Sequence, residues 1–352
     1  MSETLLKYNA PAENFNEALP IGNGRIGGMI FGGAAKELIR LNEDSVWSGG
    51  PRHRINPDAK EGLEEVRQFI KSGDIPAAEK AAFEKMQGVG PNSRHYMPLG
   101  DLNLSMSLEG KARNYHRELD IARAVSTVSF TVEEKNYTRT AFCSAPDQVM
   151  IVEIACDTPG SVNLECSLDG RDDYYDDNRP NSPCSILYTG GTGSSDGIFF
   201  AVCLAGKTQG GELRTLGGKI SVKNADSVTL ALSVRTSFYS EHYIESAEVD
   251  AEMALDCDYD ELLFRHVSDY RELFDRVELN LSDNSGENLS EMTTDRRILR
   301  LRGDELDSTD CERLIHDNKL IELYFNFGRY LMISASRAGT QPMNLQGIWN
   351  ED

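Results

Sequence analysis

Four polar or aromatic residues lie within seven positions near the end of this 352-residue sequence: Asn344, Gln346, Trp349 and Asn350. Their amides supply hydrogen-bond donors and acceptors, and the indole supplies a flat apolar face. A sugar ring uses both, because its hydroxyl groups bind amides while its C–H face stacks on an aromatic ring. A polar loop after a long apolar helix is equally typical of a connection between two helices of a bundle. The residues alone leave both interpretations open.

A second cluster of this kind is LNEDSVWSGGP at 41–51, which contains Trp47. Its indole, amides and acids suit sugar recognition, so Trp47 joins the candidate substrate-binding residues. On composition alone a structural role is favoured. In that alternative, Asn42 and Asp44 make side-chain turns and Trp47 covers the edge of a sheet.

The stretch Gly22-Asn-Gly24-Arg-Ile-Gly27 matches the G-x-G-x-x-G pattern of dinucleotide-binding folds. That fold requires a strand before the glycines and a helix that opens at them. Here Pro20 precedes the pattern, and an apolar strand-like run, 26–31, follows it. The context therefore predicts a glycine-rich turn between two strands.

The other polar clusters predict no metal or cofactor site. The acidic stretch at 169–178 lacks the ordered spacing of a calcium loop, which favours a solvated acidic loop. The six histidines show no H-E-x-x-H pattern, and no P-loop or G-x-S-x-G motif occurs. We therefore expect no cofactor and no metal.

Charge and composition narrow the possible partners. The sequence has 57 acidic and 36 basic residues, a net charge of −21. This balance argues against nucleic acid and anionic membranes as partners, because both attract basic surfaces. Oligomeric state cannot be predicted from the sequence.

The cysteines and the first residues bear on localisation. Seven cysteines at irregular spacing contain no C-x-x-C pair, which argues against a disulfide framework or a zinc ribbon. The first 15 residues lack a basic segment followed by an apolar one, so no secretory signal is expected there. We expect reduced cysteines and a cytoplasmic location.

Hydrophobic periodicity divides the chain. A short helical insert is predicted at 57–86, because apolar residues recur there at helical spacing after Asn56-Pro57. From Leu99 to Phe238 the period is two, with glycine-rich turns between the runs. Many short strands without intervening helices predict an antiparallel β-sandwich, with the insert outside its sheets.

After about residue 245 the period returns to that of a helix. A short strand is predicted at 277–281, and a long helix at about 310–337. The long helix has apolar residues on nearly all sides, which is typical of a helix inside a larger helical assembly.

Six stretches, in the same order along the chain, resemble glycoside hydrolase family 95, the family of inverting α-L-fucosidases and related α-L-galactosidases. They are EALPIGNGRIGGMIFGG (17–33), LNEDSVWSGGP (41–51), YMPLGDL (96–102), YTRTAFCSAPDQVMIV (137–152), HVSDYRELFDRVELNL (266–281) and GRYLMISASRAGTQPMNLQGIWNED (328–352). The resemblance implies a mainly β architecture. It predicts an N-terminal β-sandwich domain at 1–245, a helical linker at 246–305, and the start of a truncated (α/α)6 catalytic barrel at 306–352.

The resemblance also implies an activity, the hydrolysis of terminal α-linked L-fucose from fucosylated oligosaccharides without a cofactor. In the family, the catalytic glutamate, asparagines and aspartate follow the W-N-E stretch, so no residue here receives a catalytic role. Available carboxylates are Glu43, Asp44, Glu351 and Asp352, and nothing in the sequence pairs them. We therefore expect this chain alone to be inactive. The alternative is a non-catalytic carbohydrate-binding or interaction module.

Overall fold

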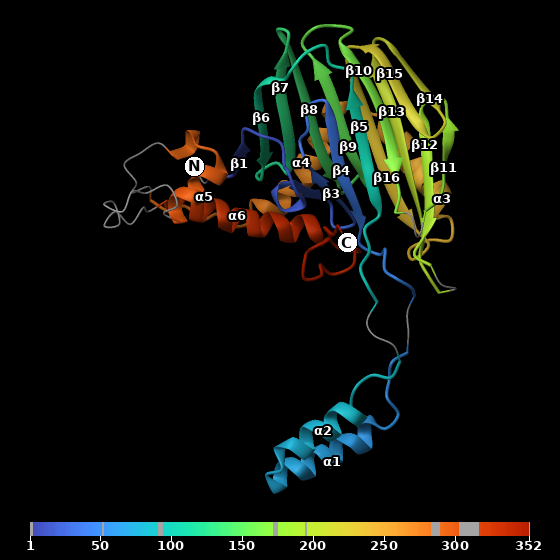
Figure 1. The fold of residues 1–352 in the computed structure, drawn as a ribbon, viewed down its shortest axis with the longest axis vertical. Helices are drawn as coiled ribbons and strands as arrows, with labels where there is room; N and C mark the ends of the chain where they lie inside the picture. The colour runs from blue at the N-terminus through green and yellow to red at the C-terminus, as the bar shows by residue number, and fades with distance from the viewer. Residues whose placement is uncertain are drawn as a thin grey trace.

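A computed structural model describes residues 3–50, 53–90, 94–171, 175–193, 196–282, 289–302 and 317–351. Two antiparallel sheets lie face to face and form most of the body of the protein (Figure 1). The predicted mainly β architecture with an antiparallel sandwich is confirmed.

The larger sheet has nine strands, in the order β1-β6-β7-β8-β9-β16-β13-β12-β11. Its strands, in chain order, are β1 (Leu5–Tyr8), β6 (Arg113–Asp120), β7 (Val125–Val132), β8 (Lys135–Ser144), β9 (Val149–Cys156), β11 (Tyr175–Ser182), β12 (Ser185–Gly191), β13 (Phe199–Gln209) and β16 (Ser227–Thr236). Consecutive strands β6 to β9 are joined as a meander, whereas β16 inserts between β9 and β13. The sheet therefore cannot form until residues more than 70 positions apart have met.

The smaller sheet has seven strands, in the order β14-β15-β10-β5-β4-β3-β2. Its strands are β2 (Leu19–Gly22), β3 (Ile26–Ile30), β4 (Lys36–Glu43), β5 (Gly100–Met106), β10 (Val162–Asp169), β14 (Glu212–Leu216) and β15 (Lys219–Ala225). Since β2 and β3 pair antiparallel, the glycine pattern forms the turn between them, as predicted.

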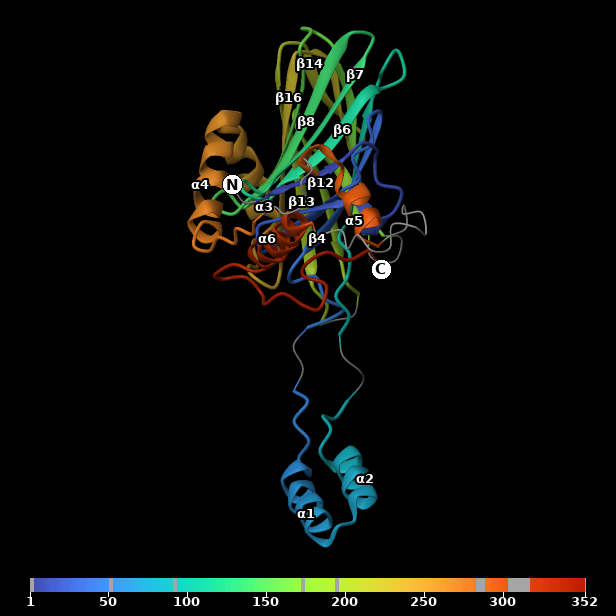
Figure 2. The same ribbon diagram turned by 90° about the vertical axis from the view of Figure 1, so that its left-hand side faces the viewer.

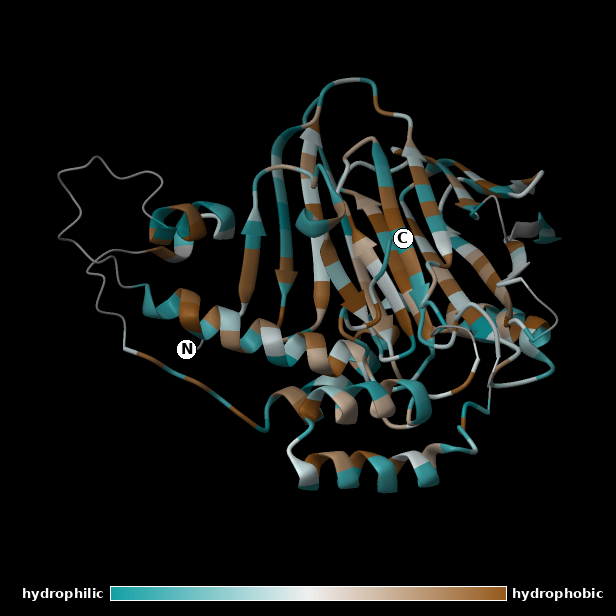
Figure 3. Cartoon of the chain, turned by 60° about the horizontal axis from the view of Figure 1, so that its bottom comes forward, coloured by the Kyte–Doolittle hydropathy of each residue, from teal (hydrophilic) through white to brown (hydrophobic). Residues whose placement is uncertain are grey.

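The main core lies between the two sheets and follows from the period of two. Along β10, Val162, Leu164, Cys166 and Leu168 are buried while the intervening residues are partly or fully exposed. Figure 3 shows the same alternation of hydrophobic and hydrophilic residues along other strands. A strand with this pattern buries one face, which fixes its register against its neighbours.

Helices α3 (Tyr243–Asp256) and α4 (Tyr259–Phe274) pack on the outer face of the larger sheet (Figure 2). Ala247 and Ala251 of α3 pack in one buried cluster with residues of β12 and β13. The small side chain of alanine suits the packing of this helix on the sheet. Strands β9, β13 and β16 are consequently buried on both faces, which explains their nearly continuous apolar sequences.

The predicted insert forms two helices, α1 (Ala59–Ser72) and α2 (Ile75–Lys85), which project from one end of the sandwich (Figures 1 and 2). Gly73 ends α1 in the left-handed conformation, with φ of 81°. Asp74 caps α2 by accepting a hydrogen bond from the Ala77 amide at 3.1 Å. The expectation that the insert lies outside the sheets is confirmed.

The C-terminal part contains α5 (Thr294–Arg302) and α6 (Asn318–Ala335), and α6 corresponds to the predicted long helix. It begins at Asn318, and Asp317 caps it through the Leu320 amide at 2.9 Å. The predicted start at about 310 lies outside the described residues. No helix in the described ranges combines the length and apolar character that crossing a lipid bilayer requires.

The prediction of a strand at 277–281 is wrong. The described residues there belong to no strand, and side chains of α6 bond to their backbone groups. Arg329 donates a hydrogen bond to the Val277 carbonyl at 2.8 Å, and the Leu281 amide donates to Glu322. The segment is therefore held against a helix. How the chain divides into sandwich, linker and barrel stays a prediction.

Candidate functional site

The candidate site lies where one end of the sandwich meets the polar tail, defined here as residues 337–351 after α6. Figure 1 shows this C-terminal segment beside β3 and β4. The other parts of the site are the β2–β3 turn at 23–25 and the loop at 44–50 that follows β4. Three of the stretches that carry the family resemblance, 17–33, 41–51 and 328–352, thus meet here.

Glycines in the β2–β3 turn make this meeting possible. A Cβ atom on Gly22 would lie 2.5 Å from the Ser334 carbonyl oxygen, and one on Gly24 would lie 2.6 Å from the Arg337 side chain. A Cβ on Gly27 would lie 3.0 Å from Ile348. The Gly24 amide also donates a hydrogen bond to the Ser334 carbonyl at 2.7 Å. The three glycines of the G-x-G-x-x-G pattern therefore allow the end of α6 and the tail to pack on the turn.

Trp349 anchors the tail to the sandwich. Its ring is 5% exposed and belongs to a buried cluster with Met29, Ala335 and Ile348. Its indole nitrogen donates a hydrogen bond to the Ile21 carbonyl at 2.9 Å. In this structure the ring is a packing element, and neither of its faces is open for stacking.

Asn350 is also buried, and its backbone and side chain both make hydrogen bonds. Its backbone amide donates to Asn42 Oδ1 and its side-chain amide donates to the Tyr96 carbonyl, both at 3.0 Å. Its side-chain oxygen accepts a hydrogen bond from Gln346 at 2.8 Å. Asn350 therefore joins β4, the segment before β5 and the tail.

The ring of Trp47 packs against the ring of Tyr96. The two ring centroids are 5.3 Å apart, and the Trp47 indole nitrogen donates to the Asp44 carbonyl at 2.9 Å. The Tyr96 hydroxyl in turn donates to the Ile348 carbonyl at 2.7 Å. Trp47 is thus connected to the tail through Tyr96.

Asn344 and Gln346 occupy a turn at the surface of the tail. Asn344 Oδ1 accepts a hydrogen bond from the Gln346 amide at 2.9 Å, and the backbone of Asn344 pairs with that of Gly347. Leu345, between them, is fully exposed. A substrate-binding role for the five candidate residues stays a prediction, and the contacts above show that Trp349 and Asn350 support the tail.

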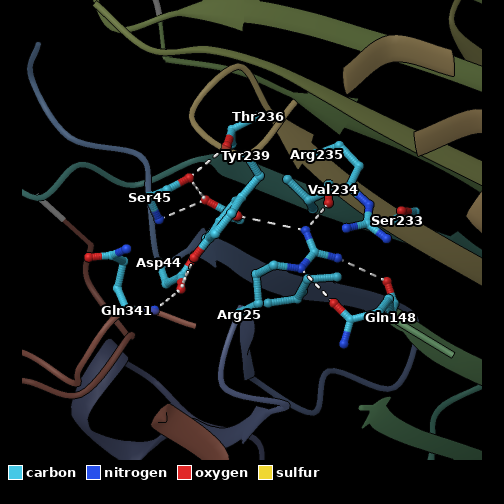
Figure 4. A network of polar contacts seen from close by, with 12 residues as sticks. Arg25, Asp44, Ser45, Gln148, Ser233, Val234, Arg235, Thr236, Tyr239 and Gln341 are labelled. Carbon is cyan, nitrogen blue, oxygen red and sulfur yellow. Dashed lines mark hydrogen bonds and ion pairs between the residues drawn. The ribbon is translucent and has the colours of Figure 1, made fainter. Parts of the chain in front are cut away.

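A buried charged network lies beneath these residues (Figure 4). Arg25, from the β2–β3 turn, donates to Gln148 Oε1 at 2.7 Å and to the Val234 carbonyl. Its guanidinium lies 3.7 Å from Glu43, which is completely buried at the end of β4. The network therefore joins both sheets around one cation and one carboxyl group.

Asp44 links this network to the tail. Its Oδ2 atom accepts a hydrogen bond from the Tyr239 hydroxyl at 2.8 Å and another from the Gln341 backbone amide at 2.6 Å. Burial raises the pKa of Asp44, and these two donors oppose that rise. Burial, followed by the negative charge of Asp44, raises the pKa of Glu43 to about 8. Burial likewise lowers the pKa of Arg25, while Glu43 opposes the change.

A cavity of about 240 Å³ opens beside this network. It is lined by Ser45, Trp47, Gly49, Gly50, Arg94, Ile198, Phe238 and Gln341. Larger cavities of about 540 and 450 Å³ lie elsewhere, one between the larger sheet and the start of α4, the other between α6 and β1. Among the residues that the structure describes, no group of three potential metal ligands comes together.

Sequence reasoning missed most of the residues that build this site. Arg25, Tyr96 and Gln148 lie in stretches that resemble the family but received no role, and Tyr239 lies in none of these stretches. Asn42 was assigned only a local turn, whereas its side chain accepts from Asn350. One signal in the sequence could have located the site. The stretches at 17–33, 41–51 and 328–352 all carry the family resemblance, which is consistent with a shared location in the fold.

Two protein-family models match this chain. Residues 6–241 match the model described as glycosyl hydrolase family 65, N-terminal domain. Residues 258–352 match the glycosyl hydrolase family 95 catalytic domain. The chain therefore belongs to the glycosyl hydrolases through its family 65 N-terminal domain, and its C-terminal part is similar to the family 95 catalytic domain. The boundary between the two matches falls at α3, and the polar tail lies in the family 95 part.

Two similar proteins carry names of fucosidases. The chain is 33% identical to "Alpha-L-fucosidase 2" of Arabidopsis thaliana over 99% of its length, and covers 44% of that protein. It is 28% identical to "Probable alpha-fucosidase A" of Aspergillus niger over 95% of its length, and covers 43% of that protein. The chain thus spans less than half the length of these relatives and corresponds to their N-terminal portion.

A solved structure has the same fold. The structure titled "Putative kojibiose phosphorylase from human microbiome" aligns with 94% of this chain and 41% of its own, with a TM-score of 0.54 and 10% sequence identity. At this level of identity the likeness concerns the fold alone. It supports the arrangement of an N-terminal β domain followed by helices.

Proposed function

We propose that this chain is the N-terminal part of an inverting α-L-fucosidase, which hydrolyses terminal α-linked L-fucose from fucosylated oligosaccharides. The observation that carries the proposal is the 33% identity to "Alpha-L-fucosidase 2" across 99% of the chain. The sandwich would support the catalytic domain, and the polar tail would lead from the sandwich into it.

We propose further that the 352 residues alone are inactive. An inverting glycosidase needs two groups on opposite faces of the sugar, separated by roughly 6.5–9.5 Å with room for a water molecule. Glu43 is completely buried, and Asp44 is 3% exposed and accepts two hydrogen bonds. Glu351 lies 3.7 Å from Arg40, and Asp352 lies outside the described residues. Glu43 and Asp44 are therefore engaged in holding the junction, and Glu351 is half-exposed beside Arg40.

The test is fucose release from 2′-fucosyllactose by the purified 352-residue chain, with "Alpha-L-fucosidase 2" as the positive control. We expect no release from a sample that unfolds cooperatively, because Glu43 and Asp44 are buried and no described pair of free carboxyl groups is placed for inversion. Release at a rate comparable to that of the control would overturn the inactivity. Substitution of Glu43, Asp44, Glu351 and Asp352 would then identify the catalytic pair.

A non-catalytic carbohydrate-binding role is the second candidate. The cavity beside the junction favours it, because Trp47 and Phe238 offer aromatic surface while Arg94 and Gln341 offer polar groups. We expect calorimetric titration with 2′-fucosyllactose to give measurable heat if this role is correct. The Trp47→Ala variant should then abolish that heat, and an absence of heat with the unmodified chain would exclude this candidate for that glycan.

A further inference from the structure

Two adjacent carboxyl groups at the end of β4 each have one oxygen atom that accepts no hydrogen bond from any described residue. These atoms are Glu43 Oε1 and Asp44 Oδ1, and both are buried. The two residues are neighbours in the chain, each carboxyl group affects the pKa of the other, and Glu43 Oε1 lies 3.7 Å from the Arg25 guanidinium. Buried oxygens normally have a donor, so a pair without one requires an explanation.

The other oxygen of each carboxyl group is satisfied. Glu43 Oε2 accepts from the Ser45 amide at 2.8 Å and from the Ser45 hydroxyl at 2.6 Å. Asp44 Oδ2 accepts from Tyr239 and from the Gln341 amide (Figure 4). A single proton between the two remaining oxygens would satisfy both of them. It would also remove the repulsion between two buried negative charges in contact, which cannot both ionise at low cost.

We infer that Glu43 and Asp44 share one proton, carried by Glu43, and that Asp44 is thereby a positioning residue that holds the polar tail through Gln341. The functional meaning of this inference rests on the proposed function, because the tail belongs to the part that matches the family 95 catalytic domain. The shared proton itself is a property of this chain and can be tested without measuring hydrolysis.

The environment places the proton on Glu43. Asp44 has two donors, Tyr239 and Gln341, that stabilise its negative charge, and its contact with Glu43 lowers its pKa in the same sense. Glu43 has no exposed surface, and Asp44 raises its pKa more than Arg25 lowers it. Asp44 therefore remains the anion and Glu43 the neutral donor.

Other charged groups face the pair from the neighbouring elements. Arg25 comes from the β2–β3 turn and Arg235 from β16, where it is paired with Asp250 of α3 at 2.6 Å. Arg25 is held by Gln148 and the Val234 carbonyl, at 3.7 Å from Glu43. The pKa of Tyr96 is raised by burial and then by the two carboxyl groups, so Tyr96 stays neutral. Arg25 is thus the cation that approaches Glu43 directly.

The arrangement predicts a dependence on pH. Below the pKa of Glu43 the pair keeps its proton and the tail stays bound. As the pH rises through about 8, Glu43 ionises beside Asp44, and repulsion displaces the acceptor of the Gln341 amide. Because the pKa is raised above the ordinary 4.5, folded-state stability from this pair falls as the pH rises from 4.5 through about 8.

The test is a pH titration of the Gln341 backbone amide by NMR on the intact 352-residue chain. We expect its signal to shift in a single step centred near pH 8. In the Glu43→Gln variant the step should disappear, because a neutral amide replaces the neutral acid and cannot ionise. A step that persists unchanged in this variant, or no step in the unmodified chain, would overturn the inference.

The matched control is Glu153→Gln on β9. Burial raises the pKa of Glu153 to about 7, yet its carboxyl group bonds to Thr229 beside a different cavity. This variant should leave the Gln341 step in place. If Glu43→Gln does not fold, carbon-13 NMR of the side-chain carboxyl groups decides the question in the unmodified chain. A Glu43 carboxyl carbon already in its ionised position at pH 6 would contradict the shared proton.

Discussion

The interior between the two sheets and the surface of α6 are both rich in large apolar side chains, but the described residues cover them to different extents. Between the sheets, Phe200, Leu204 and Ile39 have no exposed surface. On α6, Tyr330 is equally buried against the sandwich, whereas Tyr324 on another side is 78% exposed. The core between the sheets is covered, with residues of α4 and α6 packed at its end, whereas α6 buries one side and leaves the other accessible.

This difference follows the division between the two family matches. The closed core belongs to the family 65 N-terminal domain, and α6 lies in the part that matches the family 95 catalytic domain. A helix that is apolar on most sides is suited to a larger helical assembly. Under the proposed function, further helices of the catalytic domain would cover the exposed side of α6.

The largest effect is expected from opening the closed core. Phe200→Ala removes a fully buried ring that packs against Tyr188, with centroids 5.5 Å apart. We expect a loss of about 3–5 kcal/mol in the free energy of unfolding, because a cavity remains where the ring was. Phe325→Ala, on the 37%-exposed ring of α6, should cost less than about 1 kcal/mol. Urea unfolding of both variants measures the difference, and equal losses would contradict the contrast between the two surfaces.

An intermediate effect is expected where the two regions meet. Gly24 and Gly339 have nearly the same φ angle, 90° and 87°, so an alanine at either position should suffer similar backbone strain. Only at Gly24 would the new Cβ also collide with Arg337, whereas nothing lies within 4 Å at Gly339. Gly24→Ala should therefore cost about 1–3 kcal/mol more than Gly339→Ala. Thermal or urea unfolding tests this. Equal costs would mean that Gly24 is needed for the conformation of the turn and not for packing against Arg337.

The smallest effect on stability is expected at the exposed side of α6. Tyr324→Ser should change the free energy of unfolding by less than about 0.5 kcal/mol, because the side chain is mostly in solvent. It should nevertheless reduce self-association of the chain, since it interrupts an accessible apolar surface. Light scattering over a concentration series measures this. Phe264→Ser on α4, where the ring is 71% exposed, is the control. Equal reduction by both variants would show that the exposed side of α6 contributes no more to self-association than another exposed apolar side chain does.

Much of the fold could be predicted because it depends on local patterns. The period of two from Leu99 to Phe238 predicted the strands, and the helical spacing at 57–86 predicted the insert that forms α1 and α2. The strand predicted at 277–281 failed because its apolar residues alternate locally, while α6 supplies the partners of its backbone. Local periodicity contains no information on which distant element competes for these hydrogen bonds.

The sequence by itself determined most of the strands and helices, where the glycine turn lies, and that residues near both ends share a family pattern. Only the tertiary structure decided that Trp349 is packed rather than open, that Asn350 bonds to Asn42 across 308 positions, and that the Gln341 amide donates to Asp44 across 297 positions. The physical reason is distance along the chain. Burial and hydrogen bonding between residues hundreds of positions apart depend on how the sheets and α6 pack, and no local pattern specifies that packing.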